Sequence, residues 1–193
     1  ATQGWVITDA SKAADISQQA LFTVATGGTI TTSGDFKIHT FTGPGTFCVS
    51  QIGNCVGGPS NVDYVVLAAG AAGGSSTGAN AGAGGYRTTF PSPGCNAGSF
   101  PITATAFPIT VGGGGAAVAC STGNDGSSSI FSTITSTGGG GGGHNTEIPA
   151  FPGQYGRGRA GGSGGGGQNP SPGGAGNTPP VSPPQGNAGG NGA

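Results

Sequence analysis

The chain has 193 residues, of which 46 are glycine and only 6% are charged, and its net charge is -1. This balance argues against a nucleic-acid-binding protein, which needs clustered Lys and Arg, and against ordinary disorder, which combines low hydrophobicity with high net charge. The longest apolar stretch, YVVLAAGAAGG, is too short for a membrane span, so we expect no membrane insertion. The surface is expected to consist of small polar residues and bare backbone.

Residues 1–30 are predicted to form an N-terminal attachment segment. They show neither the basic nor the apolar region of a signal peptide. A weak apolar face at roughly helical spacing predicts a short helix within 8–22, and its residues are Ala10, Ala13, Ala14 and Leu21. Trp5 and Val6 precede this helix, and they either pack on the following domain or dock into a partner.

Residues 31–137 are predicted to form a β-rich domain, because they hold nearly all the large apolar side chains. The stretch DFKIHTF alternates with period 2, GPG marks a turn and TFCV resumes the pattern, so 36–49 is expected to be a β-hairpin. Further short strands are predicted in VDYVVLAA, FPITV and SIFSTIT, each bounded by Gly or Ser clusters. Together they favour a mainly β fold, an antiparallel short-stranded domain of the sandwich type.

The cysteines leave their chemical state open. The spacings of Cys48, Cys55, Cys95 and Cys120 match no zinc-binding motif. Two disulfides, Cys48–Cys55 and Cys95–Cys120, are one possibility, although four cysteines allow three connectivities. Free buried thiols are the other.

Residues 138–193 are predicted to form a glycine- and proline-rich region of polyglycine II or polyproline II strands. Such a strand has three residues per turn and satisfies no backbone group internally. Glycine strands, however, have no Cβ to hold them apart, so they can pack side by side and exchange N–H···O=C bonds. We predict a packed bundle with inner segments at 112–115, 138–143 and 161–167. A flexible linker is the alternative.

Several patterns imitate catalytic or ligand-binding motifs. GRGRAG at 156–161 has the dinucleotide-binding spacing but lacks the preceding strand, the following helix and the acidic residue. Its two arginines are too few for an RNA-binding element and are expected to contact carbonyls on the surface. No nucleophile elbow, carboxylate pair or metal-binding cluster is evident. We therefore expect no catalytic residue, no cofactor and no metal.

The ordered motifs resemble a known family. Six motifs carry the resemblance: TTSGDFKIHTFTGPGTFCV, VDYVVLAAGAAGG, GAGGYRTTF, FPITVGGGG, GSSSIFSTITSTGGGGGG and GNTPPVSPPQGNAGG. Together they are similar, over residues 25–193, to the glycine-rich domain of bacteriophage tail-fibre and adhesin proteins, especially those of aquatic phages and cyanophages. The resemblance implies a virion structural component with β-strands and packed polyglycine II helices, often with a host-recognition role. The usual closing strand of the family is not found here, so the chain is either truncated or completed by another copy.

These expectations combine into a functional hypothesis. The protein would be a tail fibre or other fibre appendage on the virion, with other virion proteins and further copies of itself, a trimer or an array, as partners. Loops joining glycine strands would contact a host-surface glycan or protein, because aromatic and Arg side chains contribute most at binding surfaces. The candidate contact residues are Tyr86, Arg87, His144, Tyr155, Arg157 and Arg159. The alternative for Tyr86 and Arg87 is that they form a structural turn. The alternative for the whole protein is a capsid decoration or filament-forming coat protein that binds no receptor.

Overall fold

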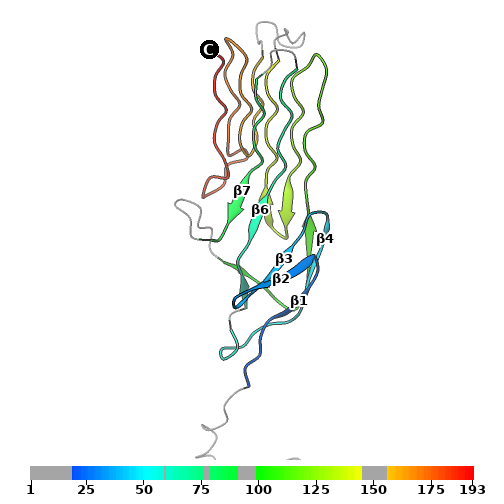
Figure 1. Cartoon of the computed structure of the whole chain (residues 1–193). Helices are drawn as coiled ribbons and strands as arrows, with labels where there is room; N and C mark the ends of the chain where they lie inside the picture. Colours follow the sequence, from blue (N-terminus) through cyan, green and yellow to red (C-terminus); the bar gives the residue numbers. More distant parts are fainter. Residues whose placement is uncertain (1–18, 59, 76–78, 91–98, 145–155) are drawn as a thin grey trace, which may run out of the picture.

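The computed structural model describes residues 19–58, 60–75, 79–90, 99–144 and 156–193. The molecule is elongated, with β-strands in one half and long rows of extended chain in the other, and the C-terminus lies at the tip of the rows (Figure 1). The fold is mainly β, as predicted, and none of the described residues is helical. The helix predicted at 8–22 falls largely outside the described residues, and residues 19–22 are irregular.

The strands form one larger antiparallel sheet and three small pairs. The five-stranded sheet has the order β1-β4-β9-β10-β11, and the pairs are β2-β3, β5-β8 and β6-β7. The β6 strand packs against β10 and β11. The strand bounds are β1 Val24–Thr26, β2 Thr29–Ser33, β3 Phe36–Thr40, β4 Gly45–Gln51, β5 Asn61–Val62, β6 Val65–Leu67, β7 Tyr86–Thr88, β8 Phe100–Pro101, β9 Ala106–Thr110, β10 Ser129–Phe131 and β11 Ile134–Ser136.

The hairpin predicted at 36–49 is wrong in its pairing. Both of its strands exist, but β3 pairs with β2, and β4 pairs instead with β1 and β9. A tighter turn competes successfully with the GPG turn: β2 and β3 are joined through Gly34, whose φ of 56° is accessible to glycine without strain. Strand β4 is then free to insert its buried Phe47 and Val49 into the core of the five-stranded sheet.

A cluster of aromatic rings forms the centre of the β half. The ring of Phe131 on β10 lies 4.9 Å from Phe100 and about 6 Å from three further rings, those of Phe47, Phe107 and Tyr64. Offset and edge-on ring pairs at these separations add to the stability that burial itself provides. The cluster joins β10 of the large sheet to β8 and to the Tyr64 segment, so it holds the separate strand pairs together.

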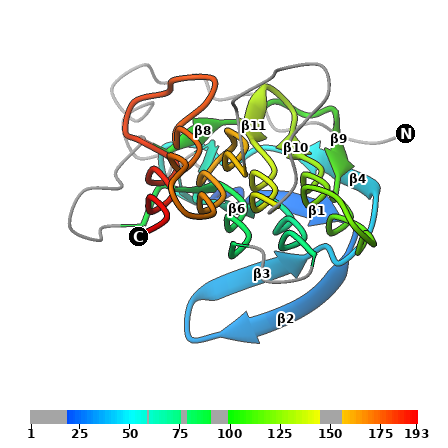
Figure 2. The ribbon, with the colours of Figure 1, turned by 90° about the horizontal axis from the view of Figure 1, so that it is seen from above.

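The extended rows continue the strands of the β half. Strand β6 runs on into 68–75, row 79–85 leads into β7, β9 runs on into 111–118, row 122–128 leads into β10, and β11 runs on into 137–144. Residues 156–193 add further rows beside these. Seen along their length, the rows are narrow coils packed side by side (Figure 2). The bundle therefore also takes in segments on the N-terminal side of the predicted boundary at 137/138.

Replacing Phe131 with alanine should test the aromatic cluster. We expect Phe131→Ala to lower the free energy of unfolding by about 3–5 kcal/mol, because it opens a cavity among four other rings. Phe36→Ala is the matched control, since Phe36 is 68% exposed, and it should change stability by less than about 0.5 kcal/mol. Urea unfolding followed by tyrosine fluorescence would measure both, and equal losses would contradict the assignment of the core.

Candidate functional site: the glycine bundle and its far end

The six consecutive glycines at 138–143 lie at the centre of the bundle, and all six are buried. Every one of their backbone N–H groups donates a hydrogen bond. Amides three residues apart donate to the same neighbouring segment. The reason is that the strand makes one turn in three residues, so residues i and i+3 face the same neighbour. The pairs, with N···O distances of 2.9–3.4 Å, are Gly138–Ser128 Oγ, Gly139–Ala69 O, Gly140–Ser163 O, Gly141–Asp125 Oδ1, Gly142–Ala72 O and Gly143–Gly166 O.

The six carbonyl groups of the same segment are satisfied in the same way. They accept from the amides of three neighbouring segments, again with a repeat of three residues and with distances of 2.8–3.0 Å. The donors are Gly162 to Gly138, Gly126 to Gly139, Gly82 to Gly140, Arg159 to Gly141, Gly123 to Gly142 and Ala79 to Gly143. A segment that has no internal hydrogen bonds is thus fully bonded to its neighbours, which a flexible linker would not be.

Glycine is required along this segment for a steric reason. A Cβ built on any residue of 138–143 would meet a backbone carbonyl of a neighbouring row at well under 3.0 Å, a separation that real Cβ atoms essentially never show. For Gly138 to Gly143 in turn, the contacted carbonyl is that of Gly126, Gly82, Arg159, Gly123, Ala79 and Gly156. The rows are therefore too close together for any side chain between them.

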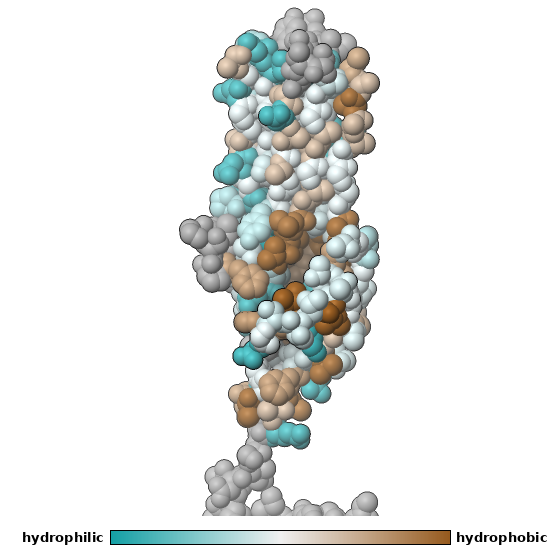
Figure 3. Space-filling model, viewed as in Figure 1, coloured by the Kyte–Doolittle hydropathy of each residue, from teal (hydrophilic) through white to brown (hydrophobic). Residues whose placement is uncertain are grey.

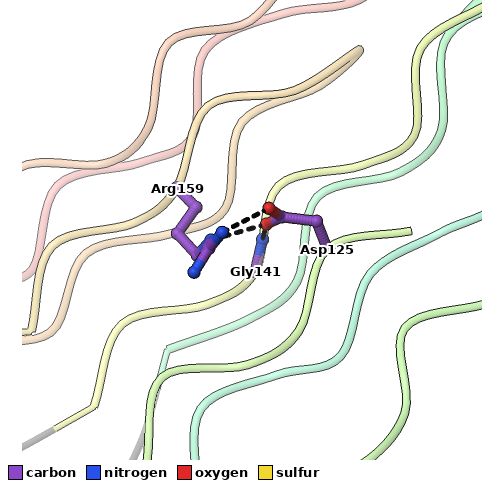
Figure 4. Close-up of polar contacts among 3 residues, drawn as sticks. All are labelled: Asp125, Gly141 and Arg159. Atoms are coloured by element: carbon purple, nitrogen blue, oxygen red, sulfur yellow. Dashed lines mark hydrogen bonds and ion pairs between the residues drawn. The ribbon is translucent and has the colours of Figure 1, made fainter. Parts of the chain in front are cut away.

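A side-chain clamp crosses the outer face of the central segment. Asp125 Oδ1 accepts from Gly141 N at 2.9 Å and from Arg159 Nε at 2.8 Å, while Arg159 Nη2 lies 2.7 Å from Asp125 Oδ2 (Figure 4). The two side chains are 36% and 54% exposed, so water screens the ion pair and its own contribution is small. Asp125 was not predicted from the sequence; its role is to accept from a glycine amide that no backbone carbonyl reaches.

A second clamp closes the base of the bundle around Gln185, which is 2% exposed. Its Oε1 accepts from Thr137 N at 2.8 Å, and its Nε2 donates to Thr137 Oγ1 and to Pro179 O. Asn177 Oδ1 in turn accepts from Val181 N and Gln185 N. These contacts hold the proline-rich turn against the start of the hexaglycine segment. Nothing in the local pattern of NTPPVSPPQ identifies Gln185 in advance, since its partner Thr137 is remote in sequence.

The structure separates the predicted contact residues into three places: the base of the bundle, its side and its far end. Tyr86 and Arg87 lie on β7 at the base of the bundle, where Tyr86 N donates to Gln185 O and Arg87 Nη1 reaches Thr135 O at 3.4 Å. Arg159 lies along the side of the bundle in the clamp with Asp125. His144 is buried at the end of the central segment, and Gly156 packs against its carbonyl. Tyr155 lies outside the described residues.

Some of the connections between rows lie at the end of the bundle away from the β half (Figure 1). Ser75 and Ser121 are hydrogen-bonded there, Gln168 N donates to Gly156 O, and Ser171 N donates to Gln168 O. The exposed Arg157 directly follows Gly156 at this end, and the exposed Asn169 follows Gln168. We refer to this surface, defined by Ser75, Ser121, Arg157, Gln168 and Asn169, as the far end. Of the six predicted contact residues, Arg157 is exposed on it.

The cysteine thiols differ from both alternatives considered above. Cys48 and Cys120 are free and exposed, so the structure contains neither a Cys48–Cys55 nor a Cys95–Cys120 disulfide, and these thiols are not buried. Cys55 is also exposed, and Cys95 lies outside the described residues. Cys48 faces solvent because it alternates with Phe47 and Val49, whose side chains point into the core of the sheet.

Comparisons with known proteins identify the domain. A family model described as a glycine-rich domain matches residues 42–193. The chain belongs to this family. The match includes the whole bundle and begins after the β2-β3 hairpin, whereas the resemblance read from the sequence started at residue 25. No curated protein and no solved structure matches the chain.

Two features of the described part of the glycine-rich domain protein bear on its chemistry. Neither a helix suited to crossing a bilayer nor a group of three or more metal-ligating side chains occurs among the described residues. The arrangement forms a stiff, nearly uncharged rod, in which backbone polar groups are hydrogen-bonded to neighbouring rows. Its exposed polar side chains include Asp125 and Arg159 on the side of the rod and Arg157 and Asn169 at the far end.

A glycine-to-alanine pair should test the packing of the bundle. Gly140→Ala is expected to destabilise the protein by at least about 1 kcal/mol, because the added Cβ must displace the Arg159 carbonyl. Gly113→Ala is the matched control. The inner position predicted for 112–115 is wrong at Gly113, which is exposed in an outer row with an open Cβ position, so the change should be neutral or slightly stabilising. Thermal unfolding would compare the two. A neutral Gly140→Ala would mean that 138–143 behaves as a linker.

Amide hydrogen exchange provides an independent check of the same segment. Because all six amides of 138–143 are buried and hydrogen-bonded, their protection should be comparable to that of β6. The measurement is exchange followed by mass spectrometry or NMR on the intact protein. Complete exchange of these glycines within seconds would be incompatible with a packed bundle.

Substitutions at Asp125 should separate its two roles. Asp125→Ala removes the acceptor of Gly141 N and the ion pair with Arg159, and we expect a loss of about 1 kcal/mol. Asp125→Asn keeps an oxygen acceptor for the amide and loses only the charge, so it should cost a few tenths of a kcal/mol. Denaturant unfolding would measure both; equal losses would assign the effect to the ion pair instead.

Proposed function

We propose that this protein is a structural component of a virion, a tail fibre or other fibre appendage, and that its far end contacts the host surface. The observation that carries the proposal is the architecture: a rod of hydrogen-bonded glycine rows extends from a β half, and some of the connections between rows lie at its tip (Figure 1). A rod of this kind suits a spacer, because its stiffness comes from backbone hydrogen bonds along its entire length. The resemblance of its motifs to phage tail-fibre and adhesin proteins supports the same role.

The composition of the bundle supports an exposed, extracellular-facing task rather than an enzymatic one. Small uncharged side chains cover the rows, and Asp125 and Arg159 neutralise each other on the side of the rod. Such a surface has little electrostatic attraction for unrelated molecules. Contacts would then be concentrated where the side chains are larger and more polar, which is the far end with Arg157, Gln168 and Asn169.

The alternative is a capsid decoration or filament-forming coat protein that binds no receptor. The same rod would then act as a spacer or a lattice element. The neutrality of the bundle favours neither reading over the other, but the exposed Arg157 and Asn169 at the far end favour a contact surface there.

Cell binding by the purified protein would test the proposal. Fluorescently labelled protein should bind the surface of host bacteria, and Arg157→Ala combined with Asn169→Ala should reduce that binding at least about tenfold, as expected for loss of a central Arg contact. Arg87→Ala at the base of the bundle is the matched control and should leave binding unchanged. Loss of binding with Arg87→Ala alone would place the contact surface at the base instead.

The position of the protein on purified particles separates the two roles. Antibody-gold labelling imaged by electron microscopy should mark the tips of fibres or tails. Label spread evenly over the capsid lattice would support the decoration protein and contradict the proposed adhesion role.

A further inference from the structure

The β2-β3 hairpin stands apart from the rest of the β half (Figure 2). All five residues of β2 are exposed, as are the residues of β3 except the half-buried His39. The hairpin is fixed to the body at its base, where His39 Nδ1 lies 2.8 Å from Gly27 O and the His39 ring packs edge-on against Phe47 at 5.0 Å. The hairpin also precedes the part of the chain that matches the glycine-rich domain family, which begins at residue 42.

A two-stranded ribbon of this kind is incomplete as a structural unit. An isolated hairpin is marginally stable in water and normally needs a third strand or a packed face. Here three large apolar side chains remain open to solvent: Ile30 is 45% exposed, Ile38 44% and Phe36 68%. Apolar surface gathers over this region and the neighbouring β6-β7 pair (Figure 3). The hairpin therefore has an unpaired edge and exposed apolar side chains on both faces, with Ile30 on one face and Phe36 and Ile38 on the other.

The two edges of the hairpin differ in how they are protected. Proteins block exposed edge strands with charged side chains, especially Lys, or with proline. Strand β3 carries Lys37, whereas β2, with the sequence TITTS, has neither a charge nor a proline. Among the described residues, no backbone hydrogen bond reaches β2 from outside the hairpin. The open edge is thus β2.

We propose that β2 pairs with β2 of a second copy of this chain, in an antiparallel arrangement around a twofold axis. The sheet would then have four strands, in the order β3-β2-β2-β3. When a strand pairs with the same strand of a second copy, any charged side chain near the axis lies close to an identical charge, which is unfavourable. Self-pairing therefore requires a neutral strand, and β2 is neutral along its whole length. With the axis at Thr31, each Ile30 lies opposite Thr32 of the second copy, and threonine pairs with β-branched partners well across strands.

Pairing at β2 goes beyond the proposed function, because it holds for a fibre and for a coat protein alike. It places the contact between copies in the β2-β3 hairpin. The Lys37 residues of the two copies lie on the outer strands of the joined sheet, so they do not oppose each other across the axis.

Charge substitution at the axis tests the pairing. The full-length protein should show a concentration-dependent dimer by analytical ultracentrifugation, and Thr31→Lys should raise the dimer dissociation constant at least about tenfold, because it sets two lysines opposite each other. Thr31→Val, which keeps a neutral β-branched side chain, should dimerise like the native chain. Thr46→Lys is the matched control: Thr46 is exposed on β4, a strand that has β1 and β9 as neighbours, and the change should leave the dissociation constant unaltered.

Each other outcome would overturn the proposal. These outcomes are a native chain that stays monomeric over the whole concentration range, a trimer or larger assembly that is insensitive to Thr31→Lys, and equal weakening by Thr31→Lys and Thr46→Lys. Circular dichroism of every variant separates a lost contact from a lost fold, because Thr31 is exposed and its replacement should leave the spectrum unchanged.

Discussion

The glycine bundle depends on one constraint, the close approach of neighbouring backbones. A carbonyl oxygen of one row occupies the place where a Cβ of the next row would otherwise be. This constraint explains why six glycines follow one another at 138–143 without becoming a linker: any side chain there would collide with a neighbouring row, and every peptide group there has a hydrogen-bond partner. The large entropy cost of ordering glycine is opposed by twelve backbone groups that are bonded rather than left to water.

The two halves of the molecule are stabilised by different physics. In the β half, rings such as Phe131, Phe107 and Phe47 exclude water from a small core. In the bundle there is almost no apolar side chain to bury, so order comes from the backbone hydrogen bonds and from dense backbone packing. The halves are continuous, because strands β6, β7, β9, β10 and β11 run directly into rows. The core therefore sets the register from which the rows extend, and side-chain clamps at Asp125 and Gln185 fix rows that no strand positions.

This division also shapes what the surface can do. The backbone polar groups of the central segment are used internally, and Asp125 pairs with Arg159 on the side of the rod. The far end and the β2-β3 hairpin remain as surfaces with exposed side chains. The hairpin precedes the region that matches the glycine-rich domain family. The bundle supplies length, whereas the hairpin offers the unpaired edge of β2.

The sequence alone determined the mainly β class, the inner position of 138–143 and the need for other strands to bond it, because the glycine runs and the period-2 alternation are local patterns. It did not determine which strands pair: β3 joins β2 through the Gly34 turn, and β4 joins the large sheet, since pairing depends on competition between turns and on which apolar faces meet. The sequence also could not show that Asp125 serves Gly141 and Arg159, or that Tyr86 lies far from Arg157. Those relations join residues remote in the chain, and only the packing of the rows brings them together or keeps them apart.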